Sequence, residues 1–284
     1  MKNEEVAILY SGGSDSTLST VLVQDQYKKV HLITYKRFGL FSIENTRVYV
    51  DTLKEKFGAD KFTHSLINID RLFKFLSYHS YFRNLFKHKF FLLSTCGFCK
   101  LAMHARTIVY CLENQVKHVC DGSNKGMDIY PAQMKTVIEM ITRLYETFGI
   151  SFTTPVFDFS PPEEKSFVRE ENQDLIQYNG FSPNQQESAG NPGITTETKL
   201  FELGITPQPS VKGSEFDKQR QGRCFQLILF RIFAIKSFLA SHTMDEYIKR
   251  TVALFDDKIR LIRDIIQEYI DTGKHKKLFN GLRR

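Results

Sequence analysis

The sequence predicts an α/β fold, a parallel five-stranded sheet flanked by helices, followed by a helical C-terminal region. Over the first 159 residues, short apolar runs alternate with stretches of helical length, which is the order that right-handed βαβ crossovers produce. The chain has 284 residues, of which 42% are hydrophobic and 25% are charged. It is therefore long enough to bury a sizeable core, and its composition excludes general disorder.

The expected elements follow one another in this half without long gaps. The strands are expected at residues 6–10, 30–35, 62–69, 117–120 and 153–159. The helices are expected at residues 16–26, 42–57, 71–86, 99–114 and 131–148. Gly58 and Gly149 stop two of these helices, as glycine commonly does at a helix C-terminus.

The composition changes near Ser160. Six of the eight prolines lie between this residue and Gly222, among many Gly, Ser, Gln and Asn residues. We therefore divide the chain into an N-terminal α/β domain (1–159), a loop-rich insert or lid (160–222) and a helical C-terminal region (223–284). Short helices are expected within the insert at 163–177 and 195–203, and a long helical stretch at 225–270.

The charge balance and the cysteines indicate which partners and which cellular compartment to expect. The net charge is +7 with a pI near 9.0, which tolerates or attracts polyanions such as RNA. Basic patches at 87–89 and 275–277 are either solvated faces or RNA contacts.

The apolar stretch 225–240 contains Arg231 and Lys236, which favours a buried helix over a membrane span. We expect a cytoplasmic protein with no membrane partner; its oligomeric state stays open, a homodimer included. The five sparse cysteines do not suggest a disulfide framework.

The sharpest motif is the turn Ser-Gly-Gly-Ser-Asp-Ser-Thr at residues 11–17, directly after the first strand and opening the first helix. Two glycines let the backbone approach an anion closely, and the N–H groups of a helix N-terminus face phosphate oxygens. Asp15 in this place fits a helix cap or a Mg²⁺ ligand. A plain N-cap turn is the structural alternative, but the context and density of the motif favour phosphate binding.

This turn lacks the GK[ST] of a P-loop, and it resembles the SGGxDS loop of the PP-loop ATP pyrophosphatases. That superfamily has a HUP-like (adenine nucleotide alpha hydrolase-like) fold and includes ATP-dependent tRNA thiolases and 7-cyano-7-deazaguanine synthases. The resemblance extends to about residue 158 and implies that residues 1–159 form a PP-loop ATP-binding domain. It implies that AMP is attached to a carbonyl oxygen of the substrate with release of pyrophosphate, after which a nitrogen or sulfur nucleophile expels AMP.

The resemblance also implies residue roles, with Asp15 in the catalytic machinery. The residues implied to hold the phosphates and Mg²⁺ are Ser11, Gly12, Gly13, Asp15, Ser16 and Thr17. Those implied to lie near the base or ribose, at the end of the second strand, are Thr34, Tyr35 and Lys36. After the fourth strand, thiolases carry a GHNxDD-like loop; here Gly122 and Asn124 keep a phosphate-facing turn, the His is absent and Asp128 is displaced.

Cys96 and Cys99 form a CxxC pair at the start of a helix, and Cys224 lies far downstream. This passage resembles that of the tRNA 2-thiocytidine and 2-thiouridine synthetases, and the resemblance implies that the three cysteines hold a [4Fe–4S] cluster. The alternatives are a buried pair, a dithiol redox site, or half of a Zn²⁺ site completed by His104 or Cys120. Cys120 and Cys111 are otherwise expected in the core.

Cys224 is the second expected catalytic residue, as a cluster ligand or as a persulfide carrier. It stands at the start of a helix, next to Arg223 and close to Arg220. A helix N-terminus and two arginines would both favour its thiolate. The alternative is a small apolar residue that packs the first turn of the helix.

The favoured function is an ATP-dependent, AMP-forming sulfur transferase that acts on tRNA or on a small metabolite with a sulfur donor. The alternative is an AMP-forming amide or nitrile synthase that uses ammonia and a structural metal. A non-catalytic nucleotide sensor is a third hypothesis, and the complete turn at residues 11–16 argues against it, because a sensor has no need to bind pyrophosphate.

Overall fold

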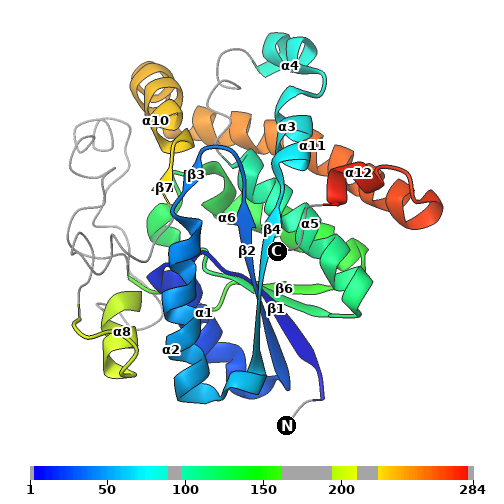
Figure 1. Cartoon of the computed structure of the whole chain (residues 1–284). Helices are drawn as coiled ribbons and strands as arrows, with labels where there is room; N and C mark the ends of the chain where they lie inside the picture. Colours follow the sequence, from blue (N-terminus) through cyan, green and yellow to red (C-terminus); the bar gives the residue numbers. More distant parts are fainter. Residues whose placement is uncertain (1–2, 89–96, 161–193, 210–222, 281–284) are drawn as a thin grey trace.

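The computed structural model describes residues 3–88, 97–160, 194–209 and 223–280. Its centre is a five-stranded sheet in the order β4-β2-β1-β5-β6, in which all neighbouring strands are parallel (Figure 1). The strands are β1 (Glu5–Leu9), β2 (Lys29–Lys36), β4 (Phe62–Asn68), β5 (His118–Asp121) and β6 (Ser151–Thr153). The predicted fold class, a parallel five-stranded sheet flanked by helices, is confirmed.

Helices cover both faces of the sheet, because the side chains of each strand alternate between the two faces. In β1, Val6 and Ile8 join the smaller buried cluster, whereas Ala7 and Leu9 join the larger one. The smaller cluster lies under α1 (Ser14–Val23), α2 (Arg47–Phe57) and α8 (Thr196–Glu202). The larger cluster lies under α3 (Asp70–Tyr78), α5 (Phe98–Asn114), α6 (Lys135–Thr147) and α11 (Met244–Thr272).

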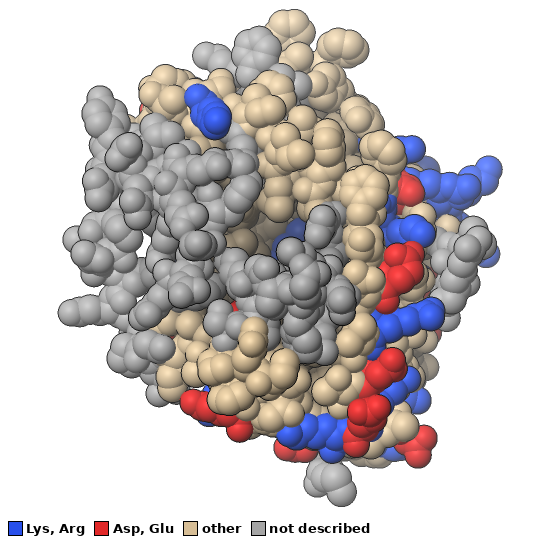
Figure 2. Space-filling view, turned by 60° about the vertical axis from the view of Figure 1, so that its left-hand side comes forward, with Lys and Arg blue, Asp and Glu red and all other residues tan. Residues whose placement is uncertain are grey.

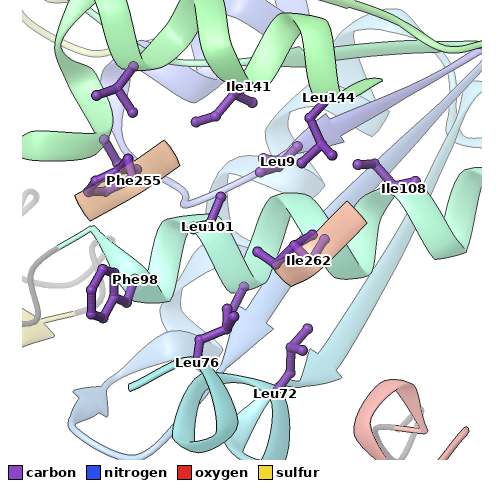
Figure 3. Packing of buried hydrophobic residues seen from close by; sticks show 14 of the residues in the cluster. Leu9, Leu72, Leu76, Phe98, Leu101, Ile108, Ile141, Leu144, Phe255 and Ile262 are labelled. Atoms are coloured by element: carbon purple, nitrogen blue, oxygen red, sulfur yellow. The ribbon is translucent and has the colours of Figure 1, made fainter. Parts of the chain in front are cut away.

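The larger cluster joins the two ends of the chain. Phe255 and Ile262 of α11 pack with Leu101 and Ile108 of α5 in one continuous core (Figure 3). Gly97, which precedes α5, has a φ of +91°, and a Cβ there would lie 2.6 Å from Phe255 Cζ. This glycine therefore lets the start of α5 approach α11 closely, which helps to position Cys99, two residues further along the chain.

A short antiparallel ribbon, absent from the sequence-based prediction, links the C-terminal part to the end of β2. It pairs β3 (Leu40–Phe41) with β7 (Arg223–Cys224), so that Leu40 is opposite Cys224. The chain then forms α10 (Gln226–Phe230), a π-helical segment (Arg231–Leu239), α11 and α12 (Lys276–Phe279). A capping box at Thr243 and Glu246 starts α11.

Three element predictions need correction. The fifth strand was expected at 153–159, but β6 spans Ser151–Thr153 and turns follow it. The helix expected at 71–86 is divided into α3 and α4 (Tyr81–His88), because Ser80 has a φ of 54° that a helix does not accept. The helix expected at 42–57 begins as a 3-10 turn at Ile43–Thr46, ahead of α2.

Other expectations are confirmed or lie outside the described residues. The helix expected at 195–203 is α8, whereas the one at 163–177 lies outside them. The stretch 225–240 is helical but has an outer side, on which Ile228 and Ile232 are exposed. Within the described ranges, no helix has the length and apolar character that a membrane span requires.

Candidate functional site

A cavity of about 410 Å³ opens at the carboxyl ends of β1 and β5. In the sheet, β1 has β2 as its neighbour along one edge and β5 along the other, so the strand order continues in opposite directions from β1. This is the switch point of the sheet, where α/β proteins of this kind bind ligands because successive crossovers diverge and leave a crevice. The last residues of the two strands, Leu9 and Asp121, line the cavity together with the residues that follow them, Tyr10 and Gly122.

The turn at residues 11–17 lies where the sequence predicts it, between β1 and α1. Gly12 has a φ of +75°, which reverses the chain, and Gly13 is the residue before the first turn of α1. Ser16 Oγ accepts a hydrogen bond from the Ser11 N–H (3.2 Å) and donates one to the Gly13 carbonyl (3.1 Å). Ser11, Gly13, Asp15 and Ser16 line the cavity. Thr17 is fully buried and bonds the Tyr10 hydroxyl (3.2 Å) instead.

Gly122 brings the turn after β5 against the start of α1. A Cβ at this position would lie 2.5 Å from Ser16 N and 2.7 Å from the Asp15 carbonyl carbon. Real side chains do not approach backbone atoms so closely, so the contact needs glycine. The structure therefore brings Gly122 against the turn at residues 11–17, and its predicted role in phosphate binding stays a prediction.

Asp15 also receives a contact from far along the chain. Thr196, the first residue of α8, donates a hydrogen bond to Asp15 Oδ1 (2.7 Å). The neighbouring Glu197 accepts one from the hydroxyl of Ser14 (3.5 Å). The α8 segment thus orients the outer side of the turn while Asp15 still borders the cavity.

The three residues predicted near the base or ribose separate at the end of β2. Thr34 and Tyr35 line the cavity, and Lys36 is exposed and paired with Glu44 (3.6 Å). Thr34 Oγ1 donates to the Tyr10 carbonyl (2.9 Å), which ties β2 to β1 at the cavity floor. Burial raises the pKa of Tyr35, so its phenol stays protonated.

Lys100 and Asp121 are cavity residues that the sequence-based prediction did not include. Lys100 Nζ lies 2.9 Å from Asp121 Oδ2 and donates to Ser123 Oγ (2.6 Å). Burial alone would raise the pKa of Asp121, but the Lys100 ammonium, His104 and the Ser123 N–H reverse this and leave the pKa lowered. The cavity therefore contains a fixed buried carboxylate with a cation beside it.

The cysteines predicted to act together are only partly described. Cys96 lies outside the described residues; Cys99 is half-buried in the first turn of α5, and Cys224 lines the cavity. Burial and then the nearby Cys99 raise the pKa of the Cys224 thiol. The prediction that its surroundings favour the thiolate is therefore wrong in net direction, because burial outweighs the positive charge. The predicted Arg220 lies outside the described residues.

Among the described side chains, the cation that contacts Cys224 is Arg37, which the sequence-based prediction missed. Its side chain is 2% exposed, and Nη2 donates to Cys224 Sγ at 3.1 Å. Arg37 is the residue after β2, and the β3–β7 ribbon carries Cys224 back to it. The sequence contains one indication that Arg37 belongs to the site: it directly follows Lys36, which was predicted to lie near the base or ribose.

The remaining cysteines are core residues, as expected. Cys111 and Cys120 are 1% and 2% exposed, and burial raises the pKa of their thiols to about 12 and about 11. Cys120 Sγ contacts Thr153 Oγ1 (3.1 Å), and His104 Nδ1 contacts the Tyr145 hydroxyl (3.0 Å). Among the residues described, no three His, Cys, Asp or Glu side chains are arranged to hold a metal ion.

No family model matches the chain, and no curated protein matches it. Among solved structures, it is similar to a predicted subunit of tRNA methyltransferase from Methanocaldococcus jannaschii, with 18% identity, a TM-score of 0.39, and coverage of 78% of this chain and 96% of that one. It is also similar to the U34-tRNA thiolase NcsA from Methanococcus maripaludis with its [4Fe-4S] cluster, with 14% identity, a TM-score of 0.34, and coverage of 93% and 73%. These scores are too low to assign a family, and the fold assignment rests on the sheet itself.

Proposed function

We propose that this chain is an ATP-dependent, AMP-forming sulfur transferase that acts on tRNA or on a small metabolite. One observation carries the proposal: the turn at residues 11–16 and the thiol of Cys224 open into the same cavity at the switch point of the sheet. An anion-binding turn and a sulfur atom in one cavity suit a two-step reaction. ATP first adenylates the substrate, and sulfur then displaces AMP from it.

In this proposal, the N–H groups of the turn and of the first turn of α1 hold the departing pyrophosphate, as helix N-termini favour negative charge. The substrate carbonyl oxygen attacks the α-phosphorus, and the bond to pyrophosphate breaks. A sulfur nucleophile then forms a bond to the activated carbon, and AMP leaves with the electron pair of the broken C–O bond. Lys100 lies on the cavity wall, where it would balance phosphate charge.

The proposal assigns residues to the two groups that the resemblance implies, Mg²⁺ and a [4Fe–4S] cluster. Asp15 is the carboxylate at the turn that would hold Mg²⁺, which when bound neutralises phosphate charge. Cys224 lines the cavity, Cys99 lies in the first turn of α5, and Cys99 is close enough to contribute to the raised pKa of the Cys224 thiol. With Cys96 they would hold a [4Fe–4S] cluster, which supplies an iron open to sulfur.

The test compares the nucleotide products that the wild type and variants of the turn form from ATP. Wild-type protein is incubated with MgATP, unfractionated tRNA and sodium sulfide, and nucleotides are separated by chromatography. We expect AMP and pyrophosphate from the wild type and at least a tenfold loss with Asp15→Ala or Ser16→Ala. Ser14→Ala is the matched control, because its hydroxyl bonds Glu197 and does not line the cavity. ADP as the product, or full activity of both variants, would refute the proposal.

The sulfur half has a separate readout. Cys224→Ser should still bind MgATP, measured by calorimetry, but should lose transfer of ³⁵S from labelled sulfide to the acceptor. If AMP formation instead proceeds with ammonium and is equal in Cys224→Ser and wild type, nitrogen is the nucleophile, and the amide or nitrile synthase replaces the sulfur transferase.

A further inference from the structure

Most hydroxyl groups that line the cavity donate their hydrogen to an atom of the protein. Those whose hydrogen is committed in this way belong to Ser11, Ser16, Thr34, Tyr35 and Thr46. A hydroxyl has a single hydrogen to donate. These five groups can therefore accept a hydrogen bond from a ligand, but other side chains must recognise the acceptor atoms of that ligand.

Gln133, in contrast, keeps two donors for a ligand. It lines the cavity, and its Oε1 accepts a hydrogen bond from the Asn124 N–H (3.0 Å). Because a backbone N–H can only donate, this bond identifies which end of the amide is the oxygen. Within the described ranges, the NH₂ group of Gln133 has no hydrogen-bond partner. The end of the amide that is left for the cavity is thus its donor end.

The surroundings of Gln133 place it between the two ends of the reaction. Its bond to Asn124 connects it to the turn after β5, which touches the first turn of α1. Its neighbour Ala132 packs at the start of α5, where a Cβ on Gly97 would lie 3.3 Å from the Ala132 N. The proposed function has phosphate at α1 and sulfur at the start of α5. The carbon that is first activated and then attacked by sulfur must lie between them, beside Gln133.

We propose that Gln133 is a specificity-determining residue, whose Nε2 donates a hydrogen bond to an uncharged acceptor atom of the substrate next to the reacting carbon. Such an atom is a carbonyl oxygen or an unprotonated ring nitrogen, as in a pyrimidine base. The charges of the cavity wall support an uncharged group, because the amide of Gln133 is neutral and Lys100 is already paired with Asp121 (2.9 Å). The use of this bond in the reaction rests on the proposed function, whose acceptor it further defines.

Two substitutions separate this role from a structural one, in which Gln133 only holds Asn124. Gln133→Glu keeps an oxygen for the Asn124 N–H but replaces the donor with a second acceptor. Gln133→Met keeps the length of the side chain and removes both. A structural role requires that glutamate is tolerated and methionine is not. A donor role requires that both weaken substrate binding, and glutamate more, since two acceptors then face each other without a hydrogen.

The first measurement is binding to the full chain, without turnover. Calorimetry at about pH 8, where a glutamate is ionised, uses uridine, cytidine and, as a carboxylate of similar size, benzoate. We expect a nucleoside to bind about fivefold more weakly to Gln133→Met and about tenfold or more weakly to Gln133→Glu, with MgATP binding to Gln133→Met unchanged. Gln267→Glu is the matched control, because this glutamine is exposed on α11 and donates to Asp271 (2.9 Å).

The second measurement needs no variant to fold. The NH₂ group of Gln133 in the labelled wild type is assigned in proton–nitrogen correlation spectra, and we expect its proton signals to move downfield when uridine or cytidine is added. No shift with either nucleoside, or a shift with MgATP alone, would overturn the inference. Nucleoside binding to Gln133→Glu that equals the wild type, or a dependence on Gln133 of benzoate binding alone, would overturn it as well.

These readouts are independent of the proposed reaction. A wild type that forms no AMP refutes the proposed function and leaves the contact between Gln133 and the nucleoside standing. A wild type that forms AMP, but whose Gln133 signals and nucleoside affinities do not respond, removes the role of Gln133 and leaves the proposed function in place.

Discussion

Gly122 is the point where two backbone segments of the site touch. A methyl group there would meet Ser16 N at 2.5 Å, and backbone atoms cannot move aside as a flexible side chain can. We expect Gly122→Ala to destabilise the protein by about 1–3 kcal/mol, as overpacking does, and to weaken MgATP binding because the turn is displaced. Urea unfolding and calorimetric titration measure the two effects.

Gly273→Ala is the control for this substitution. Gly273 ends α11 with a φ of +69° and has open space around it, so alanine there meets backbone strain only. A loss of about 1 kcal/mol with unchanged MgATP binding is expected. If both variants bind MgATP as the wild type does, the contact at Gly122 has no part in the site.

His104 makes stability depend on pH. Burial, with Lys100 adding to it and Asp121 opposing, lowers its pKa to about 3. The unfolded chain protonates this histidine below about pH 6.5, so between these values the unfolded state binds more protons and acid favours unfolding. From pH 7 to pH 5 His104 should account for a loss of about 2 kcal/mol. Urea unfolding of His104→Gln at both pH values should show a correspondingly smaller loss; equal losses would contradict the assignment.

Site residues could be predicted where they are adjacent in sequence and missed where packing unites them. The turn at residues 11–16 carries its own signal, since glycines, hydroxyls and a helix start occur together. Lys100 and Asp121 come from a helix and a strand, and nothing in either segment alone indicates their ion pair. Arg37 acquires a role only because the β3–β7 ribbon returns Cys224 to the end of β2.

At the scale of elements, α8 is the segment that supports the turn from outside. Thr196→Val keeps the shape of the side chain but removes the hydrogen bond to Asp15 Oδ1. With Asp15 less well oriented, the KM for MgATP should rise by about fivefold, the equivalent of one hydrogen bond, while the urea midpoint changes little. Thr198→Val on the same helix, whose hydroxyl contacts Thr195 (3.0 Å), should leave KM unchanged. An equal effect of both would mean that α8 acts only through its fold.

The predicted elements differ from the structure where local signals compete with packing. The apolar run at 153–159 reads as a strand, yet pairing with β5 ends at Thr153, because β5 itself ends at Asp121. The two-residue strands β3 and β7 are too short to give a periodic pattern, and each is a strand only because it pairs with the other. Each helix expected in the first 159 residues has a counterpart, because an amphipathic pattern of 10 or more residues is a strong signal. Their ends and interruptions were not predicted: the helix expected at 71–86 is divided at Ser80, and the stretch 225–270 is divided between Leu239 and Met244.

The whole molecule is held together by a core that the sequence could not reveal. The apolar face of α11 is evident from its spacing, but its partner is not; the structure packs it on α5 and α6, under the same sheet that carries the site. The boundaries at 159 and 222 stay a prediction. The packing also places Gly97, two residues before Cys99, against Phe255, so helix α11 helps to position the start of α5 at the site.

The distribution of charge over the molecule bears on whether the acceptor is tRNA or a small metabolite. The net charge is +7, but on the face in Figure 2 Lys and Arg are interspersed with Asp and Glu along one margin, and the described side chains above the central hollow are mostly uncharged. The exposed Lys276 and Lys277 form no ion pair within the described ranges, unlike Lys87, which lies 2.5 Å from Asp257. Of the two predicted basic patches, the one with Lys276 and Lys277 is therefore the better candidate for phosphate contacts.

If tRNA is the acceptor, its affinity must fall as salt rises, because each phosphate contact releases counterions. With about four contacts, we expect a loss on the order of 50-fold between about 50 and about 200 mM salt in filter binding of unfractionated tRNA. Lys276→Gln with Lys277→Gln should lower the logarithmic slope by about one per contact removed. Lys199→Gln is the control, since Lys199 is already paired with Glu202 (2.8 Å). A flat salt dependence in the wild type would assign the acceptor to a small metabolite, because a neutral substrate in the cavity displaces no counterions.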